Sequence, residues 1–412
     1  MMPVINLSAG TGWQVKRELS KGDVSIIRLV EVLVSDAYAS RASDIHLDPR
    51  GSSVMVRFRI DGVLQDIHEM ILSTHLEAIA RVKILSGLRT DEHNAAQDGR
   101  FRLALDIGGS VDVRVSIMPT YYGENAVLRL LSDHAAEFTL DTLDFTPENY
   151  AKIVRAAHMP HGMILATGPT GSGKTTTLYT IVKMLNVPGI SIITIEDPIE
   201  YSIPGINQIQ VNTRSGLTFG SGLRSLLRQD PNIIMVGEIR DVETAGLAVN
   251  TALTGHLLLS TLHTSDAPTT LPRLLDMKVE PYLIASTVNL AIAQRLVRRI
   301  CRDCKRERVV RDAERASISE ILPRENIVTD ATYYCGAGCD ACNGTGYRGR
   351  VGIHEVLEID DTLREAIVGK ASANELRVCA RTKGMVPMIE DGFGKAARGD
   401  TTIEEVLRMR HE

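Results

Sequence analysis

The sequence predicts an α/β protein in which a mixed N-terminal domain precedes a parallel-sheet domain, a cysteine-bearing excursion and C-terminal helices. Three observations support this prediction. Strand-like alternation and helix-like spacing follow one another over residues 25–131. From Asn149 the order is helix, apolar strand, glycine-rich loop and helix, which is typical of a parallel sheet with crossover helices. Five of the six cysteines lie between Cys301 and Cys342.

The composition is that of an ordinary globular protein, and 412 residues leave room for two domains. A net charge of −5 gives no global attraction to nucleic acid or acidic membrane, and 4% aromatic residues argue against base-stacking platforms. We find no secretory signal and no apolar stretch near the ~18–20 residues that cross a bilayer. We therefore expect a cytoplasmic protein, where reducing conditions disfavour disulfides.

The first third of the chain predicts a lead-in and one domain. Residues 1–24 are weakly patterned. The domain over residues 25–131 opens with helical spacing in VSIIRLVEVLVSDAYAS, followed by a strand in VMVRFRIDGVL with a turn at Asp61-Gly62. A helix in HLEAIARVKILSGL and strands in RFRLAL and VDVRVSIMPT complete it. Residues 132–148 are polar and turn-prone, so we assign them as a linker.

The rest of the chain divides into three predicted segments. Residues 149–300 form the parallel-sheet domain, 301–349 the cysteine-bearing segment and 350–412 a run of short helices. Thr401 and Glu404 have capping-box spacing for the last helix. The basic run from Arg295 to Arg311 could touch anionic lipid, although a solvated helix face is the simpler interpretation.

A phosphate-binding loop is the strongest motif. Residues 168–175, GPTGSGKT, match G-x-x-x-x-G-K-[ST] in full, between an apolar strand and a helix-forming run. Glycines let backbone N–H groups converge on phosphate oxygens, and the following helix N-terminus adds positive potential. We expect Lys174 to reach the β- and γ-phosphates of ATP or GTP and Thr175 to ligate Mg²⁺. The expected nucleotide-binding residues are Gly168, Pro169, Thr170, Gly171, Ser172, Gly173, Lys174, Thr175 and Thr176.

Acidic residues follow two further apolar strands. Glu196, Asp197 and Glu200 end SIITIEDPIEY, and Glu238 ends PNIIMVGE. Because a parallel sheet collects its ligand sites at the carboxyl ends of strands, we expect these acids near the phosphates. One carboxylate would belong to the Mg²⁺ shell and another would polarise the attacking water. Taken alone, each cluster is more often an ordinary strand-end turn, but a complete phosphate loop in the same chain favours a functional role.

Histidines and arginines near these strands are weaker candidates. His256 and His263 flank the apolar strand of TGHLLLSTLHT, and a strand-end histidine taken alone is usually structural. Arg214, Arg224 and Arg228 are spaced through a loop and a helix, where arginines are usually solvated. Arginine fingers, however, must come from mobile or neighbouring elements to meet transition-state charge.

Two cysteine knuckles predict a metal site. Cys301-x-x-Cys304 is matched by Cys339-x-x-Cys342 after 34 intervening residues, a spacing typical of tetrahedral Zn²⁺. Four thiolates would close the site, so the metal is expected to be structural. A redox pair would need a thioredoxin-like βαβ context, which the sequence lacks. Cys335 lies outside both knuckles and is an alternative ligand.

In their order, these motifs resemble those of the secretion ATPase superfamily, nearest to type II secretion and type IV pilus assembly motors of the tetracysteine, zinc-containing branch. GPTGSGKTTTLY, ITIEDPIEY, LRQDPNIIMVGEIRD, TGHLLLSTLHT and QRLVRRICRDC resemble its Walker A loop, Asp box, Walker B segment, His box and pre-cysteine helix. The likeness continues upstream through ASDIHLDP, VRFRIDGVL, AAQDGRF and VDVRVSIMPTYYGENAVLRLL, and downstream through GCDACNGTGYRGRVGIHEVL and GDTTIEEVL. It covers roughly Val24 to Leu407 and is very specific.

The resemblance implies a RecA-like P-loop core and roles for individual residues. Glu200 resembles the family's catalytic glutamate, Glu238 its Walker B glutamate and His263 its His-box residue. Arg214 and Arg228 resemble arginines that sense or neutralise the γ-phosphate. The Walker B segment ends in Gly-Glu, so the motif alone does not say which acid orients Mg²⁺ and which activates water.

The resemblance also implies a cellular role. A cytoplasmic hexamer, peripheral to the inner membrane, would bind ATP between subunits and close its N-terminal domain against the phosphate-loop domain. Hydrolysis would drive an inner-membrane platform protein that adds pilin-like subunits to a fibre, without direct contact to nucleic acid. A retraction motor or a DNA-transport ATPase of conjugation or competence shares the nucleotide motifs but generally lacks the cysteine segment. A non-hydrolysing nucleotide-binding regulator would not need Lys174, Glu200, Glu238 and His263.

Two features depart from the family pattern. Many of these motors carry a further module ahead of the position of residue 24, so we expect either a short form or a piece of a longer protein. EHNAAQDGR also replaces the more usual Leu-Pro before Gln-Asp-Gly, which concerns a local turn rather than the fold.

Overall fold

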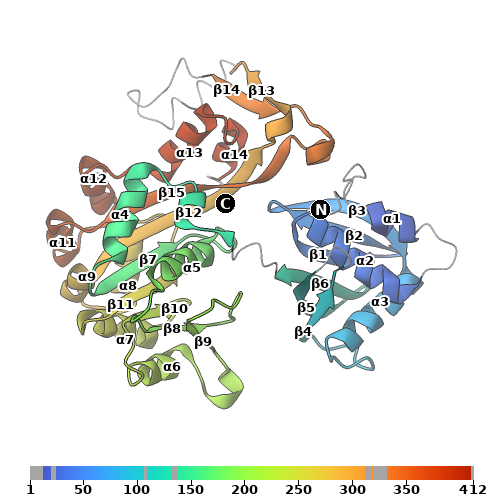
Figure 1. Cartoon of the computed structure of the whole chain (residues 1–412), viewed down its shortest axis with the longest axis horizontal. Coiled ribbons are helices and arrows are strands. Elements are labelled where there is room, and N and C mark those ends of the chain that lie inside the picture. Colours follow the sequence, from blue (N-terminus) through green and yellow to red (C-terminus); the bar gives the residue numbers. More distant parts are fainter. Residues whose placement is uncertain are drawn as a thin grey trace. The chain divides into compact units, whose positions relative to one another are not determined.

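The computed structural model describes residues 13–19, 25–105, 109–131, 137–310, 318 and 332–409. They belong to two compact units, each described by itself (Figure 1). The N-terminal unit comprises residues 1–134, 301–305 and 336–349, and the phosphate-loop unit comprises residues 135–300, 306–335 and 350–412. Most of the predicted lead-in, residues 132–136 of the predicted linker and most of the interior of the cysteine-bearing segment lie outside the described residues.

The N-terminal unit is built on a six-stranded antiparallel sheet in the order β3-β2-β1-β6-β5-β4. Alternate residues of its strands, such as Val54, Val56 and Phe58, enter a core shared with three helices. The turn at Asp61-Gly62 has φ values of 50° and 87°, the left-handed conformation that Asp and Gly tolerate best. The elements of this region are α1 (Trp13–Leu19), α2 (Ile26–Ala39), β1 (Ala42–Arg50), β2 (Ser53–Ile60), β3 (Val63–Ile71), α3 (Leu72–Leu85), β4 (Gln97–Ala104), β5 (Ser110–Thr120) and β6 (Gly123–Leu131).

The phosphate-loop unit alternates strands and helices along the chain. Its elements up to the cysteines are α4 (Pro147–Ala157), β7 (Gly162–Thr167), α5 (Lys174–Leu185), β8 (Ile192–Glu196), β9 (Asn207–Gln210), α6 (Phe219–Leu226), β10 (Ile233–Val236), α7 (Val242–Leu253), β11 (Leu257–Leu262), α8 (Thr270–Asp276), α9 (Pro281–Thr287) and β12 (Val288–Ile300). Beyond the short pair β13 (Lys305–Arg308) and β14 (Tyr333–Gly336) follow β15 (Tyr347–Glu358), α11 (Asp361–Val368), α12 (Ala373–Thr382), α13 (Met388–Ala397) and α14 (Ile403–Arg408).

A seven-stranded sheet in the order β15-β12-β7-β11-β10-β8-β9 forms the centre of this unit. The pairs from β12 through β9 are parallel. Met163 and Leu165 of β7 enter one core cluster and Ile164 and Ala166 enter another, so both faces of the strand are buried. Burial on both faces explains why these strands read as continuous apolar runs. The predicted α/β fold class is confirmed.

The structure corrects two predictions about the C-terminal third. The stretch QRLVRRI, expected to lie in a pre-cysteine helix, belongs to strand β12, whose first half pairs in parallel with β7. The basic run therefore includes a strand, and Arg298 and Arg299 are tied to Glu405 (2.6 Å) and Asp144 (2.7 Å). The segment predicted to be wholly helical begins within β15, which lies beside β12 in the same sheet.

The cap of the last helix is shifted by one residue from its prediction. Thr402, rather than Thr401, is the N-cap of α14, and its hydroxyl accepts the backbone N–H of Glu405. Thr401 instead donates its hydroxyl to the carbonyl of Arg298, 2.7 Å away. Among the described helices of the chain, none is long and apolar enough to cross a bilayer.

Candidate functional site

The carboxyl ends of four neighbouring strands carry the predicted site residues. The phosphate loop follows β7, His263 follows β11, Glu238 follows β10, and the loop with Glu200 follows β8. These strands are consecutive in the sheet and parallel, so their carboxyl ends lie along one edge. At a spacing of about 4.8 Å per strand, His263 starts one strand from the phosphate loop, Glu238 two and the Glu200 loop three.

The phosphate loop has the close packing that its glycines require. A Cβ on Gly168, where φ is +143°, would lie 2.5 Å from the carbonyl oxygen of Gln294 and 2.7 Å from Ser172 Oγ. The Lys174 ammonium donates to the carbonyls of Gly168 (2.8 Å) and Pro169 (2.9 Å). Burial lowers the pKa of Lys174 to about 8, although the negative charge of Glu238 opposes this shift. Ser172 Oγ is buried and accepts no hydrogen bond from the described residues. Phosphate oxygens would provide partners for both side chains.

Gln294 of β12 supports this loop from the neighbouring strand. Its side-chain nitrogen donates to the carbonyl of Ser172 (2.6 Å), and its side-chain oxygen accepts the hydroxyl of Thr177 on α5 (2.8 Å). Gln294 is only 2% exposed, so these bonds are sheltered from water. The Gln294 side chain therefore fixes the loop to the first turns of α5.

Glu238 and His263 face one another. The Nε2 atom of His263 lies 3.5 Å from the Glu238 carboxylate, which also forms an ion pair of 2.6 Å with Arg240. The Glu238 side chain is 11% exposed, whereas that of His263 is 48% exposed and can approach a ligand. Lys174, Glu238 and His263 thus converge at the sheet edge. His256, at the opposite end of β11, makes a local contact to the carbonyl of Thr251.

The loop after β8 is held by a buried hydrogen-bond network. Glu196 is 2% exposed and accepts hydrogen bonds from Thr194 (2.5 Å), from Gln208 (3.2 Å) and from the Tyr179 hydroxyl. Burial raises the pKa of Glu196, although these donors oppose the shift. Its carboxylate oxygens are therefore occupied by donors from the protein itself. The backbone N–H of Glu200 lies 3.4 Å from the same tyrosine hydroxyl, so Tyr179 connects α5 to the Glu200 loop.

The three candidate arginines lie on the β9–α6 segment. Arg214 lines a shallow cavity of about 410 Å³ together with residues 210–213, and no phosphate-loop residue lines that cavity. Arg224 forms an ion pair with Glu243, and Arg228 donates to the carbonyl of Arg224 (3.0 Å). Within the described part of this single chain, the structure does not bring them to Lys174.

The four cysteines of the two knuckles form one cluster. The Sγ atoms of Cys301, Cys304, Cys339 and Cys342 all lie within 4.8 Å of one another. Three of the separations are 3.8, 3.8 and 3.7 Å. A tetrahedral site with Zn–S bonds of about 2.3 Å has sulfur–sulfur edges of about 3.8 Å, so the set fits such an ion. Cys335 is outside the cluster, and its sulfur accepts from Arg306 at 3.5 Å.

Sequence reasoning missed three residues at the site: Tyr179, Arg240 and Gln294. Each has a polar side chain: Tyr179 lies in the helix after the phosphate loop, and Arg240 and Gln294 follow apolar strand segments. Gln294 directly follows the buried run VNLAIA, and Arg240 stands two residues after Glu238. A polar residue in a strand buried on both faces must find a partner, and that signal could have identified Gln294.

Comparisons with known proteins show which family and fold this chain resembles. The family model for type II/IV secretion system proteins matches residues 19–408. The type II secretion system protein HxcR of Pseudomonas aeruginosa is 45% identical over 387 residues, which cover 94% of this chain and 78% of that protein. The type IV pilus assembly ATPase PilB of Myxococcus xanthus is 45% identical over 385 residues, covering 93% and 68%. In fold, the chain is similar to the Legionella pneumophila ATPase DotB, with a TM-score of 0.68, 22% identity and coverage of 95% and 97%.

Proposed function

Because this chain belongs to the type II/IV secretion system protein family, we propose that it is a motor ATPase that drives the assembly of pilin-like subunits in type II secretion or type IV pilus biogenesis. The relatives named above include a pilus assembly ATPase, and the chain is an ATPase of the same family. One observation carries the proposal at the level of chemistry. Lys174 of the phosphate loop, Glu238 and His263 meet at the carboxyl edge of a parallel sheet.

We assign roles to the site residues from their chemistry. Lys174 and the backbone N–H groups of residues 170–176 bind the phosphates, which replace the loop carbonyls as partners of the lysine ammonium. Thr175 and a carboxylate from Glu238 would hold Mg²⁺, which neutralises charge on the phosphates. Glu200 positions the attacking water as a general base. His263 holds the Glu238 carboxylate in place at the γ-phosphate end.

The arginines belong to a different step of the proposal. Since Arg214 and Arg228 do not reach Lys174 within one chain, they are best placed to act on the nucleotide of a neighbouring subunit. That arrangement requires a ring, and we propose a homohexamer. A double-mixing experiment tests it: catalytically dead Lys174→Ala subunits mixed with Arg228→Ala subunits should restore part of the turnover that either variant lacks alone. Absence of any restoration, with mixed assemblies verified by mass photometry, contradicts action in trans.

The cysteine cluster is proposed to hold Zn²⁺ as a structural ion. Its donor set and sulfur spacing suit Zn²⁺, and four thiolates leave no open position for catalysis. Metal analysis of protein purified without chelator should find about one zinc per chain. Chelation should speed hydrogen exchange at residues 301–304 and 339–342 while ATP binding persists. A preparation without zinc would contradict the assignment.

The cellular part of the proposal is a cytoplasmic protein that reaches the inner membrane through a platform protein. The first alternatives are a retraction motor and a DNA-transport ATPase, and the tetracysteine cluster favours assembly over both. A gene deletion scored together for secretion, surface pili and DNA uptake separates these roles. Turnover that rises on addition of DNA would favour DNA transport.

Steady-state turnover tests the catalytic assignment itself. Lys174→Ala should lose ATP binding and turnover, whereas Glu200→Gln should retain binding and lose turnover by about 100-fold or more. Glu365→Gln, an exposed acid of α11, serves as the matched control and should leave turnover unchanged. If Lys174→Ala and Glu200→Gln both turn over ATP at the rate of the control variant, the assignment of the catalytic site is wrong. The same assays also exclude or support a non-hydrolysing regulator.

A further inference from the structure

The loop that follows His263 is anchored to the phosphate-loop strand. The backbone N–H of Thr264 donates to the hydroxyl of Thr167, the last residue of β7, at 2.8 Å. The two threonine hydroxyls are 2.6 Å apart. Thr264 and His263 are adjacent in the chain, so the position of this loop sets where the histidine meets Glu238.

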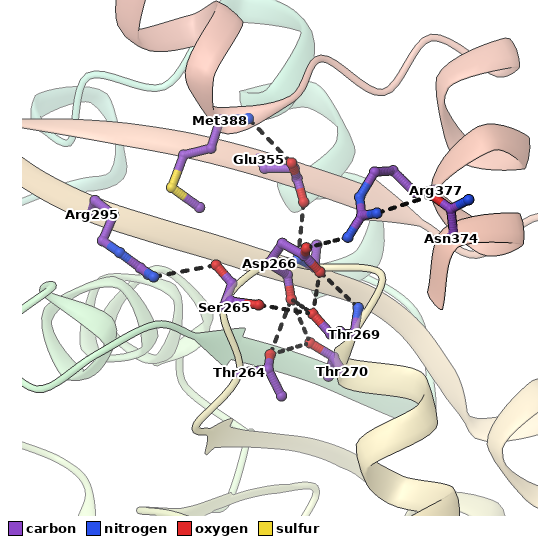
Figure 2. Close-up of polar contacts among 11 residues, drawn as sticks. Thr264, Ser265, Asp266, Thr269, Thr270, Arg295, Glu355, Asn374, Arg377 and Met388 are labelled. Carbon is purple, nitrogen blue, oxygen red and sulfur yellow. Dashed lines mark hydrogen bonds and ion pairs between the residues drawn. The ribbon is translucent and has the colours of Figure 1, made fainter. Parts of the chain in front are cut away.

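The other side of the same loop is held by the C-terminal elements (Figure 2). One oxygen of Glu355, on β15, accepts the backbone N–H of Ala267 (2.9 Å), and the other accepts that of Met388 at the start of α13 (3.1 Å). Asp266 pairs with Arg377 of α12 at 2.6 Å. Two elements that follow residue 346, β15 and α12, therefore contact the four-residue segment that begins at Thr264, and Glu355 links this segment to α13.

The Glu355 carboxylate is an unusual choice for packing alone. The residue is 5% exposed, and burying a carboxylate is costly, so such groups are weak evidence for stability. Burial raises the pKa of Glu355, although the N–H donors of Ala267 and Met388 oppose the shift. What the carboxylate provides is two acceptors at fixed spacing, one for the His263 loop and one for α13. A buried polar group of this kind sets position.

Asp266 has the complementary arrangement. Its Oδ1 accepts the N–H of Thr269 (2.8 Å) as well as the Thr269 hydroxyl, and its Oδ2 faces Arg377. Burial tends to raise the pKa of Asp266, but the bonds from Thr269 and the charge of Arg377 outweigh burial and hold the pKa below its usual range. The ionised side chain thus joins the start of α8 to α12.

We propose that Glu355, together with the Asp266–Arg377 pair, positions His263 against Glu238, so that β15, α12 and α13 control the rate of ATP hydrolysis without touching the nucleotide. Glu355 and Arg377 are positioning residues in this scheme. The proposal rests on the proposed function, in which His263 acts in hydrolysis. It predicts that changes in the C-terminal helices alter the chemical step while nucleotide affinity, set by the phosphate loop, stays the same.

Glu355→Gln is the first test, because glutamine keeps the shape but has only one accepting oxygen for two N–H donors. The expected result is a fall in kcat of about 10- to 100-fold, as a small misplacement produces, with the Kd for ATP within about threefold of wild type. Glu358→Gln, on the same strand but in an exposed pair with Arg155, is the matched control and should keep full kcat. An unchanged kcat in Glu355→Gln, or an equal loss in the control, overturns the proposal.

The double variant His263→Ala/Glu355→Gln separates positioning from general loosening. If Glu355 acts through His263, adding Glu355→Gln to His263→Ala should lower kcat by no more than about twofold further. Multiplicative losses would mean that Glu355 supports the fold independently, and the proposal would be wrong. If His263→Ala alone leaves kcat unchanged, the role of His263 in the proposed function fails instead, which is a distinguishable result.

The ion pair gives a second route that does not depend on a buried substitution. Asp266→Asn keeps an oxygen to cap Thr269 while removing the charge that faces Arg377, and Arg377→Gln changes a side chain that is 38% exposed. Each variant should lower kcat by about three- to tenfold, and the pair combined should lose no more than the worse single variant. Wild-type kcat in Arg377→Gln, with melting temperature unchanged, contradicts control through α12.

Discussion

Removal of the Tyr179 hydroxyl should loosen the segment that carries Glu200. Tyr179 is fully buried, so Tyr179→Phe keeps the packed ring and deletes one oxygen. That oxygen donates to the Glu196 carboxylate and lies 3.3 Å from the Gln208 amide and 3.4 Å from the Glu200 N–H. A hydrogen bond to a charged group contributes about 1.5–3 kcal/mol, while the two long contacts add little. Tyr179→Phe should therefore lower the free energy of local opening by about 2–3 kcal/mol.

Hydrogen exchange is the appropriate assay, because a chain of two units does not unfold as a two-state system. At about 1.4 kcal/mol per tenfold, the predicted cost corresponds to exchange about 30- to 140-fold faster in peptides covering residues 174–186 and 192–208. The control is Tyr150→Phe, because the Tyr150 hydroxyl interacts only with Asp141 at the surface among the groups that shift its pKa.

The effect of Tyr179→Phe should also depend on pH. The hydroxyl favours ionised Glu196, whose pKa is raised by burial. Its contribution is therefore present above the folded-state pKa of Glu196 and is lost as pH falls through that pKa. Exchange within about threefold of wild type at neutral pH, or a defect that grows on acidification, would refute the reasoning.

Three further results are expected. Gln294→Leu leaves the Ser172 carbonyl without its buried donor, at a cost of about 1–3 kcal/mol, so the Kd for ATP measured by calorimetry should rise by about 5- to 150-fold. Since the pKa of Lys174 is about 8 without nucleotide, affinity for ATP should weaken above pH 8, approaching tenfold per pH unit, whereas Lys174→Arg should lack this dependence. Lys395→Met leaves Asp391 buried without its 2.7 Å partner and should cost about 3–5 kcal/mol, seen as faster hydrogen exchange across α13 that Lys395→Met/Asp391→Leu partly reverses.

Much of the site follows from the sequence because its residues stand directly after apolar strands. The position of Glu238 needed only the rule that parallel strands end at one edge, whereas His263 was distinguished from His256 by its resemblance to the family's His box. The cysteine set followed from spacing, but the exclusion of Cys335 needed coordinates, since it is only four residues from Cys339.

The incorrect prediction for QRLVRRI and the missed site residues each have a physical cause. The stretch QRLVRRI was expected to be helical from its resemblance to the family's pre-cysteine helix. Its buried residues Gln294, Val297 and Ile300 recur every three positions, so no period of two reveals the strand. Tyr179, Gln294 and Glu355 act through partners 17, 122 and 88 residues away, and local pattern carries no information about such distant contacts.

The position of β15 in the sheet has a practical consequence for shortened versions of this protein. A chain ended after the second cysteine knuckle would keep the phosphate loop and both cysteine pairs, and would look complete by motif. It would lack the strand that neighbours β12, so a 13-residue strand would be left at the edge of the sheet. A long exposed edge is a template for pairing with other chains, and such a fragment should aggregate rather than yield a smaller enzyme.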